Sequence, residues 1–188
     1  MGTKKIQAYC FVWILVCCLY SYNSFGSVRD CILSRLSSQV GTTELTGNND
    51  GPKIDVYLSA AGFKPNSREP YCSAFQMWGY KGCGVLIKGV NAMALSWFSN
   101  QNKIVMKSQK GWDQVLPCDL FGLYFPSHHR IAHVGCIEKV FQTYIITLEA
   151  NTSPNASVGS ASDRDGDGVY RKKRMKKGIY MVANWIDK

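Results

Sequence analysis

Apolar residues recur at helical spacing in the part of the chain that follows residue 26. Between residues 28 and 40 they stand at four-residue intervals, and shorter stretches with one apolar face cover residues 54–61 and 71–81. From residue 120 onward, segments rich in β-branched and aromatic residues follow one another with turn-like gaps between them. Helices followed by strands are typical of an α+β domain, so we expect N-terminal helices packed on an antiparallel β-sheet.

The first 26 residues have the order of a signal peptide. Two lysines precede an uncharged apolar run over residues 8–20, and small residues end the segment near Gly26. The run is about as long as a signal-peptide core and shorter than the roughly 20 residues that a membrane-spanning helix needs. We therefore expect cleavage before Ser27 and export to the periplasm, the cell envelope or the medium.

Two alternatives to a cleaved signal peptide remain open at this stage. One is an uncleaved anchor, and the other is a lipoprotein attached at Cys17 or Cys18. Bulky Leu15 and Val16 precede these cysteines where lipid attachment needs a small residue, which disfavours the second alternative. Residues 27–188 have the length of one ordinary domain, and we expect a single one.

Cys72 is placed in the first turn of a predicted helix over residues 71–81. Ala74, Phe75 and Trp78 fall on one face of this helix. Unpaired backbone N–H groups and the helix dipole favour an anion at a helix start, so a thiol there ionises more readily. The alternative is a buried, unreactive cysteine, and the partners of Cys72 decide between the two.

Two adjacent strand-like segments supply candidate partners. Residues 132–139 contain His133 and residues 143–151 contain Glu149, with a short turn-like gap between the segments. If the gap is a three-residue turn over residues 140–142, the antiparallel register places His133 directly opposite Glu149. Directly opposed side chains lie within reach of each other, with roughly 5 Å between Cβ atoms.

An imidazole beside a carboxylate or an amide is what a cysteine hydrolase needs. The imidazole takes the thiol proton, and the third group fixes the tautomer and orientation of the ring. Because side chains alternate along a strand, Asn151 falls on the same face as Glu149 and is a second candidate for this third position. The candidate catalytic residues are therefore Cys72, His133, Glu149 and Asn151.

Six short motifs follow one another in order over about residues 41–175. They are Thr46-Gly-Asn-Asn-Asp-Gly51, Ile54-Asp-Val-Tyr-Leu58, Glu69-Pro-Tyr-Cys-Ser-Ala-Phe75, Ile131-Ala-His-Val-Gly135, Thr147-Leu-Glu-Ala-Asn-Thr152 and Asp165-Gly-Asp-Gly-Val-Tyr-Arg-Lys-Lys-Arg174. In this order the motifs resemble the CHAP family, the cysteine, histidine-dependent amidohydrolases and peptidases of bacterial cell walls and phage endolysins.

The CHAP resemblance implies a papain-like fold and peptidoglycan as the substrate, with no cofactor. Carried over residue by residue, it implies the nucleophile, the base and two candidates for the orienting position: Cys72, His133, Glu149 and Asn151. Two positions depart from the family pattern, because Cys118 and Ala150 stand where the family usually has glycine. Either residue could shift a turn that shapes the cleft.

The other cysteines leave the redox state of the protein open. Cys31, Cys83, Cys118 and Cys136 also follow residue 26, and if Cys72 stays free these four allow three disulfide pairings in an oxidising compartment. Buried free thiols are the alternative. No Cys-x-x-Cys pair occurs, which disfavours a structural zinc site.

Two further patterns could suggest a metal ion. His128 and His129 lie in a loop-like stretch, where exposure to solvent is the simpler interpretation, and as ligands they would need a third donor. Residues 163–168 begin like a calcium-binding loop, but Arg171 and Arg174 occupy its ninth and twelfth positions. A turn between two strands explains the same aspartates and glycines, so we expect no metal.

Basic residues outnumber acidic ones, with a formal net charge of +9 for the whole chain. Residues 171–177 hold six Lys and Arg side chains in seven positions. Such a run can bind nucleic acid, but an exported protein meets little of it, so we expect no nucleic-acid partner. A solvated strand edge that discourages edge-to-edge pairing and attraction to an anionic envelope surface are both compatible with the run.

An exported peptidoglycan amidase or endopeptidase that works through a thioester on Cys72 is the function that these features favour. The backbone N–H of Cys72 is one expected oxyanion donor, and the second donor is open. The alternative is a non-catalytic wall-binding module or adaptor of the same fold. The sequence identifies neither the bond that is cut nor any immunity or inhibitor protein.

Overall fold

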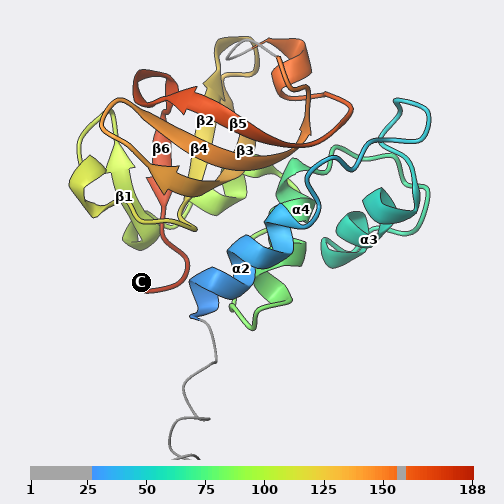
Figure 1. Ribbon diagram of the computed structural model, residues 1–188, viewed down its shortest axis with the longest axis horizontal. Helices are drawn as coiled ribbons and strands as arrows, with labels where there is room; N and C mark the ends of the chain where they lie inside the picture. The colour runs from blue at the N-terminus through green and yellow to red at the C-terminus, as the bar shows by residue number, and fades with distance from the viewer. Residues whose placement is uncertain (1–26, 156–159) are drawn as a thin grey trace, which may run out of the picture.

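Three helices precede a six-stranded antiparallel sheet in the computed structural model, which describes residues 27–155 and 160–188 (Figure 1). The helices are α2 (Val28–Ser37), α3 (Pro52–Ala60) and α4 (Cys72–Lys81). The strands are β1 (Ile104–Lys107), β2 (Leu120–Phe125), β3 (Arg130–Val140), β4 (Tyr144–Thr152), β5 (Gly168–Met175) and β6 (Met181–Ala183). The α+β class that the sequence predicts is confirmed.

The predicted signal peptide over residues 1–26, with its cleavage before Ser27, lies outside the described residues. Within residues 27–155 and 160–188, no helix combines the length and the apolar character needed to cross a membrane.

Helix α2 begins at the first described residues with a capping box. The side chain of Ser27 accepts a hydrogen bond from the backbone N–H of Asp30, and the Asp30 carboxylate accepts one from the backbone N–H of Ser27.

The strands of the sheet follow the order β1-β6-β2-β3-β4-β5. Strands β2, β3, β4 and β5 pair with their sequence neighbours, whereas β6 returns to lie between β1 and β2. The sequence pattern did not predict β1, which has four residues and is followed by no matching strand nearby. This order makes β5, the strand that holds most of the basic run, an edge strand.

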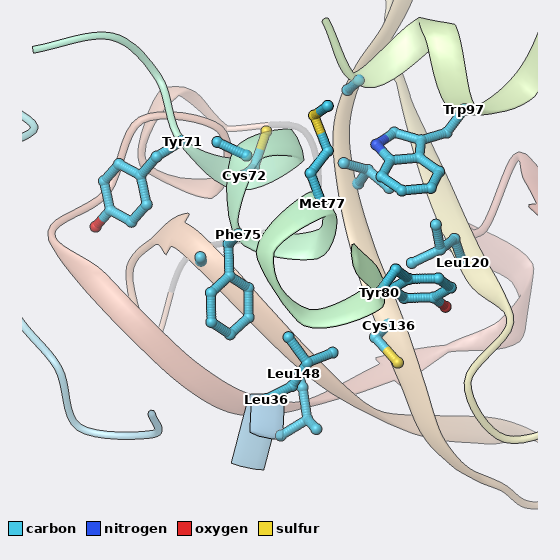
Figure 2. Packing of buried hydrophobic residues seen from close by; sticks show 14 of the residues in the cluster. Leu36, Tyr71, Cys72, Phe75, Met77, Tyr80, Trp97, Leu120, Cys136 and Leu148 are labelled. Carbon is cyan, nitrogen blue, oxygen red and sulfur yellow. The ribbon is translucent and has the colours of Figure 1, made fainter. Parts of the chain in front are cut away.

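Helix α4 is the element that joins the helices to the sheet. It contacts α2, α3, β3 and β4, and α2 and α4 lie on one face of the sheet (Figure 1). Phe75 and Tyr80 of α4 are fully buried and pack with Leu36 of α2 and Leu148 of β4 (Figure 2). Gly79 allows α2 to approach, because a Cβ atom there would lie 2.5 Å from a methyl carbon of Leu36.

The first helix is shorter than the predicted range 28–40. Ile32 and Leu36 are fully buried, but Val28 and Val40 are exposed at 42% and 36%. The apolar stripe therefore continues past both ends of the buried face. Because Ser38 caps the helix, Val40 lies in the turn that follows it.

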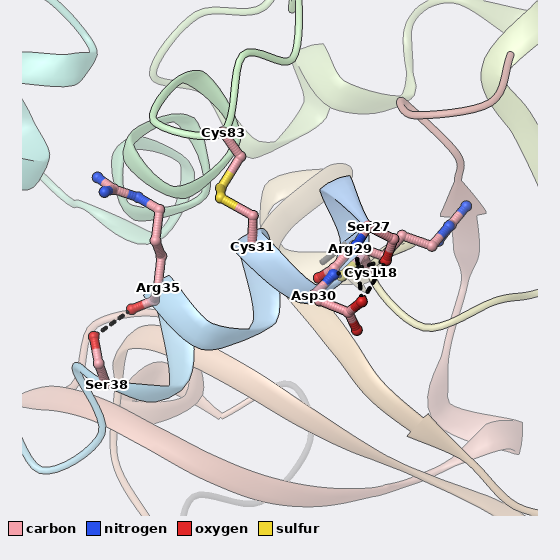
Figure 3. Close-up of a disulfide and its surroundings, with 8 residues drawn as sticks. All are labelled: Ser27, Arg29, Asp30, Cys31, Arg35, Ser38, Cys83 and Cys118. Atoms are coloured by element: carbon pink, nitrogen blue, oxygen red, sulfur yellow. Dashed lines mark hydrogen bonds between the residues drawn. A yellow bond between two sulfur atoms is a disulfide. The ribbon is translucent and has the colours of Figure 1, made fainter. Parts of the chain in front are cut away.

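One disulfide ties the first helix to the chain beyond α4. Cys31 of α2 bonds to Cys83 (Figure 3). Cys118 and Cys136 are buried free thiols. Cys118 has a φ angle of +68°, in the left-handed region that favours glycine.

Removal of the Cys31–Cys83 disulfide is expected to lower the free energy of unfolding by about 4 kcal/mol. The two cysteines are 52 residues apart in sequence, so the bond restricts a large loop in the unfolded chain. Urea unfolding of Cys31→Ser checks this value. As a control, added reductant should destabilise the unaltered protein and leave the unfolding midpoint of Cys31→Ser in place.

Candidate active site

Cys72 is the first residue of α4, and its thiol lies at a pocket. The N-cap residue of the helix, Tyr71, makes no capping hydrogen bond with its side chain, so the first turn offers its backbone N–H groups to other acceptors. Cys72 is 4% exposed and lines a pocket of about 270 Å³. Figure 2 shows its sulfur at the start of the helix, away from the core residues farther along α4.

His133 and Glu149 meet in the interior of the sheet. Nε2 of His133 in β3 lies 2.9 Å from Oε2 of Glu149 in β4, and both side chains are fully buried. The other ring nitrogen, Nδ1, is buried and makes no hydrogen bond to the described residues. Cys72 is near enough to the ring to raise the pKa of His133, so the structure places Cys72 beside the His133–Glu149 pair.

The strand register differs from the predicted one by two residues. The sequence pattern placed His133 directly opposite Glu149, but β3 and β4 pair Cys136 with Leu148, and an irregularity follows Ile137. Continued outward, this pairing sets Gly135 opposite Glu149. The predicted register was wrong mainly because the turn is different: Val140 pairs with Ile145, whereas the prediction paired Lys139 with Thr143. The bulge after Ile137 moves the pairing back by one residue, which leaves the shift of two.

Gly135 explains how Glu149 still reaches His133. A Cβ atom at Gly135 would lie 2.8 Å from Cγ of Glu149 and 2.6 Å from a ring carbon of Phe121. Because the glycine has no side chain, Glu149 can cross over it along the diagonal to His133. The shift of two residues also keeps His133 and Glu149 on the same face of the sheet.

Gly135→Ala is expected to cost about 1–3 kcal/mol of stability and to separate Glu149 from His133. The added methyl group can be accommodated only if Glu149 or Phe121 moves. Thermal unfolding and the rate of substrate hydrolysis measure the two effects. Gly82→Ala is the matched control, because its new Cβ atom would meet only the flexible end of Arg35. Equal losses in the two variants would contradict the proposed passage over Gly135.

Asn151, the other candidate for the orienting position, makes a different contact. Its Nδ2 donates a hydrogen bond of 2.8 Å to the backbone carbonyl of Arg164. Asn151 has a φ angle of +58°, a conformation that asparagine adopts more readily than most residues. Within the described residues, Glu149 is thus the side chain that contacts His133, and Asn151 holds the segment that follows β4.

A buried network of charges continues from Glu149, and the sequence pattern did not predict it. Arg174 donates from Nε to one oxygen of Glu149 at 2.8 Å and from Nη2 to the other at 2.5 Å. Arg174 also donates two hydrogen bonds to Asp163, which accepts a third from Nζ of Lys172 at 3.1 Å. Thr147 donates to Glu149 at 2.5 Å, so both carboxylate oxygens have two partners each.

This network corrects the interpretation of the basic run as a solvated strand edge. Lys172 and Arg174 are only 7% and 2% exposed, whereas Arg171 and Lys173, which alternate with them, are exposed. Arg171 pairs instead with Glu138, with 2.6 Å between the paired atoms. Alternation along β5 thus divides the run into a face that supports the candidate site and a face in solvent.

Burial and pairing shift the pKa values of Cys72, His133 and Glu149 in opposite directions. Burial favours the neutral thiol of Cys72, but contacts with His133 and with two backbone N–H groups lower its pKa below the ordinary value. Burial disfavours the imidazolium of His133, yet contacts with Cys72 and Glu149 raise its pKa to about 9. Burial likewise opposes ionisation of Glu149, and Arg174 and His133 hold its pKa well below its usual range. These shifts favour a thiolate–imidazolium pair.

The other candidate ligands do not converge on a metal site. His128 and His129 are both exposed on the loop between β2 and β3. Asp163, the first residue of the calcium-like segment, is fully buried and pairs with Arg174 and Lys172. In residues 27–155 and 160–188, no group of three or more His, Cys, Asp or Glu side chains is arranged to hold a metal ion.

Comparisons of the chain with known protein families, with curated proteins and with solved structures found no match.

Proposed function

We propose that this chain is an exported cysteine amidohydrolase of the CHAP type, with a papain-like fold, that cleaves amide bonds in peptidoglycan. The observation that carries the proposal is the buried His133–Glu149 pair beside Cys72, whose thiol lies at the start of a helix and lines a pocket. A nucleophile, a base and a group that orients the base are the three parts of a cysteine hydrolase. The motif order described above supports peptidoglycan as the substrate.

Acyl transfer follows from this arrangement in two steps. The Cys72 thiolate attacks the amide carbonyl, and the His133 imidazolium gives its proton to the leaving amine as the C–N bond breaks. Water then attacks the thioester and gives a proton to His133, and the C–S bond breaks, which releases the acid and restores the thiolate–imidazolium pair. Glu149 keeps Nε2 of His133 occupied, so that Nδ1 serves the reacting groups throughout.

The oxyanion of the tetrahedral intermediate needs donors near Cys72. The backbone N–H of Cys72 is suitably placed at the start of α4. Gln76, buried one turn farther along, donates its side-chain N–H to the carbonyl of Leu148 at 3.3 Å. This hydrogen bond joins α4 to β4, so the side-chain amide of Gln76 is already used. The backbone N–H of Cys72 is therefore the oxyanion donor that we propose.

Mass spectrometry of purified sacculi digested with the protein tests the proposed function. New amino termini in the peptide cross-links would identify an endopeptidase, and free lactyl-muramic ends would identify an amidase. Cys72→Ala is the matched control, because it keeps the fold and removes only the sulfur. Sacculi that bind the protein but remain chemically unchanged would contradict catalysis and identify the alternative, a wall-binding module or adaptor.

A further inference from the structure

We propose that Arg130 and Arg164 form a carboxylate-binding subsite in the Cys72 pocket. Resting on the proposed function, this subsite would make the preferred substrate a peptide with a free carboxylate close to the amide that is cut. Both arginines line the same pocket as Cys72. The subsite would therefore lie within one or two residues of the scissile bond.

The two arginines come from separate elements that are both anchored to the candidate site. Arg130 is the first residue of β3, three positions before His133. Arg164 follows a short 3₁₀ turn, and its backbone carbonyl accepts the hydrogen bond from Asn151. The preceding residue, Asp163, is held by the buried network behind Glu149. The backbone on both sides of the pocket is thus fixed to the strands that carry the base and its partner.

Neither guanidinium group is satisfied within the protein. Among residues 27–155 and 160–188, the side chains of Arg130 and Arg164 make no hydrogen bond or ion pair. Both are partly buried. Other arginines are paired. Arg174 forms ion pairs with Glu149 and Asp163, and Arg171 pairs with Glu138. Two partly buried cations without anionic partners flank the nucleophile.

The composition of the pocket favours an anionic ligand group. Phe63 and Ala132 contribute apolar lining, and the only acidic side chain among the lining residues, Glu69, is exposed at the rim. Arginine binds carboxylates through two parallel N–H···O hydrogen bonds, and an apolar surround strengthens the attraction. Peptidoglycan stem peptides carry such carboxylates, which makes them chemically suited to the pocket.

Hydrolysis of a matched pair of soluble stem-peptide substrates tests the subsite. One substrate has the carboxylate next to the cleaved amide free, and the other has it converted to a carboxamide. We expect the unaltered protein to show at least about tenfold higher kcat/KM with the free carboxylate. Arg130→Gln and Arg164→Gln should each reduce that value about five- to tenfold, chiefly through KM, and change hydrolysis of the carboxamide less than twofold.

Arg171→Gln is the matched control, because it removes one positive charge outside the pocket. A similar loss in this control would assign the effect to net charge and overturn the subsite. Equal cleavage of both substrates by the unaltered protein would overturn the subsite and leave the proposed function in place, even if a variant failed to fold. Cleavage of neither substrate would contradict the proposed function itself, and the subsite with it.

Discussion

Cys72→Ala is expected to lower the rate of sacculus hydrolysis by at least about 10⁴-fold while leaving the protein folded. In the proposed mechanism the sulfur forms the thioester, so the methyl group of alanine cannot replace it. The side chain is at the start of α4 and borders a pocket, so its loss removes little packing. Clearing of purified sacculi, followed by light scattering, measures the rate, and circular dichroism checks the fold.

His133→Ala should cause a loss of similar size, and the double variant should be little worse than either single one. Nucleophile and base act as one unit, so removal of either abolishes most of the same rate enhancement. Cys136→Ala is the control for a buried thiol outside the site, and it should change stability more than rate. Near-full activity of folded Cys72→Ala would contradict the thiolate mechanism.

Glu149→Gln is expected to reduce kcat/KM by about 100-fold and to move the alkaline limb of the pH–rate profile to lower pH. The limb reports loss of the imidazolium proton, and the pKa of His133 is raised to about 9 in part by Glu149. Removing the carboxylate charge removes that stabilisation, so the imidazolium deprotonates at a lower pH. Measured profiles of kcat/KM from pH 5 to about 10 check both effects.

Asn151→Ala is the matched comparison on the same strand. Its side chain holds the backbone of Arg164 and does not contact His133. We therefore expect a moderate loss of rate with the alkaline limb close to its original position. If Asn151→Ala moved the limb and Glu149→Gln left it in place, Asn151 would be the group that orients the histidine.

Local sequence signals were sufficient to predict which elements carry the candidate site. Helical spacing placed Cys72 in the first turn of a helix, and α4 begins at this residue. The β-branched segments that contain His133 and Glu149 form the paired strands β3 and β4. These signals are local, so they can be read without knowledge of the fold.

The register of the two strands could not be predicted in the same way. It depends on a bulge in β3, which has no distinctive residue signal, and on the turn that follows it. His133 and Glu149 are in contact although they are not directly opposed, because Gly135 leaves room for a diagonal approach. Gly135 was visible in the sequence two residues after His133, but its role depends on the positions of Glu149 and Phe121 in the fold.

The charge network behind Glu149 could not be predicted from the basic composition of β5. A run of basic residues normally indicates a solvated surface, but Lys172 and Arg174 of this run face inward. Lys172 and Arg174 can be buried because Asp163 and Glu149 approach them from two other segments of the chain. Alternation along a strand was a usable signal, but the buried partners are distant in sequence.

The pH dependence of Cys72 alkylation tests most directly whether this cysteine is an activated nucleophile. The rate of reaction with iodoacetamide is measured between pH 4 and about 10, with peptide mapping to separate Cys72 from Cys118 and Cys136. We expect a midpoint below 9, the ordinary thiol value, because His133 lowers the pKa of Cys72, and a return to 9 or above in His133→Ala. A midpoint at or above 9 that is unchanged in His133→Ala would contradict the thiolate–imidazolium pair.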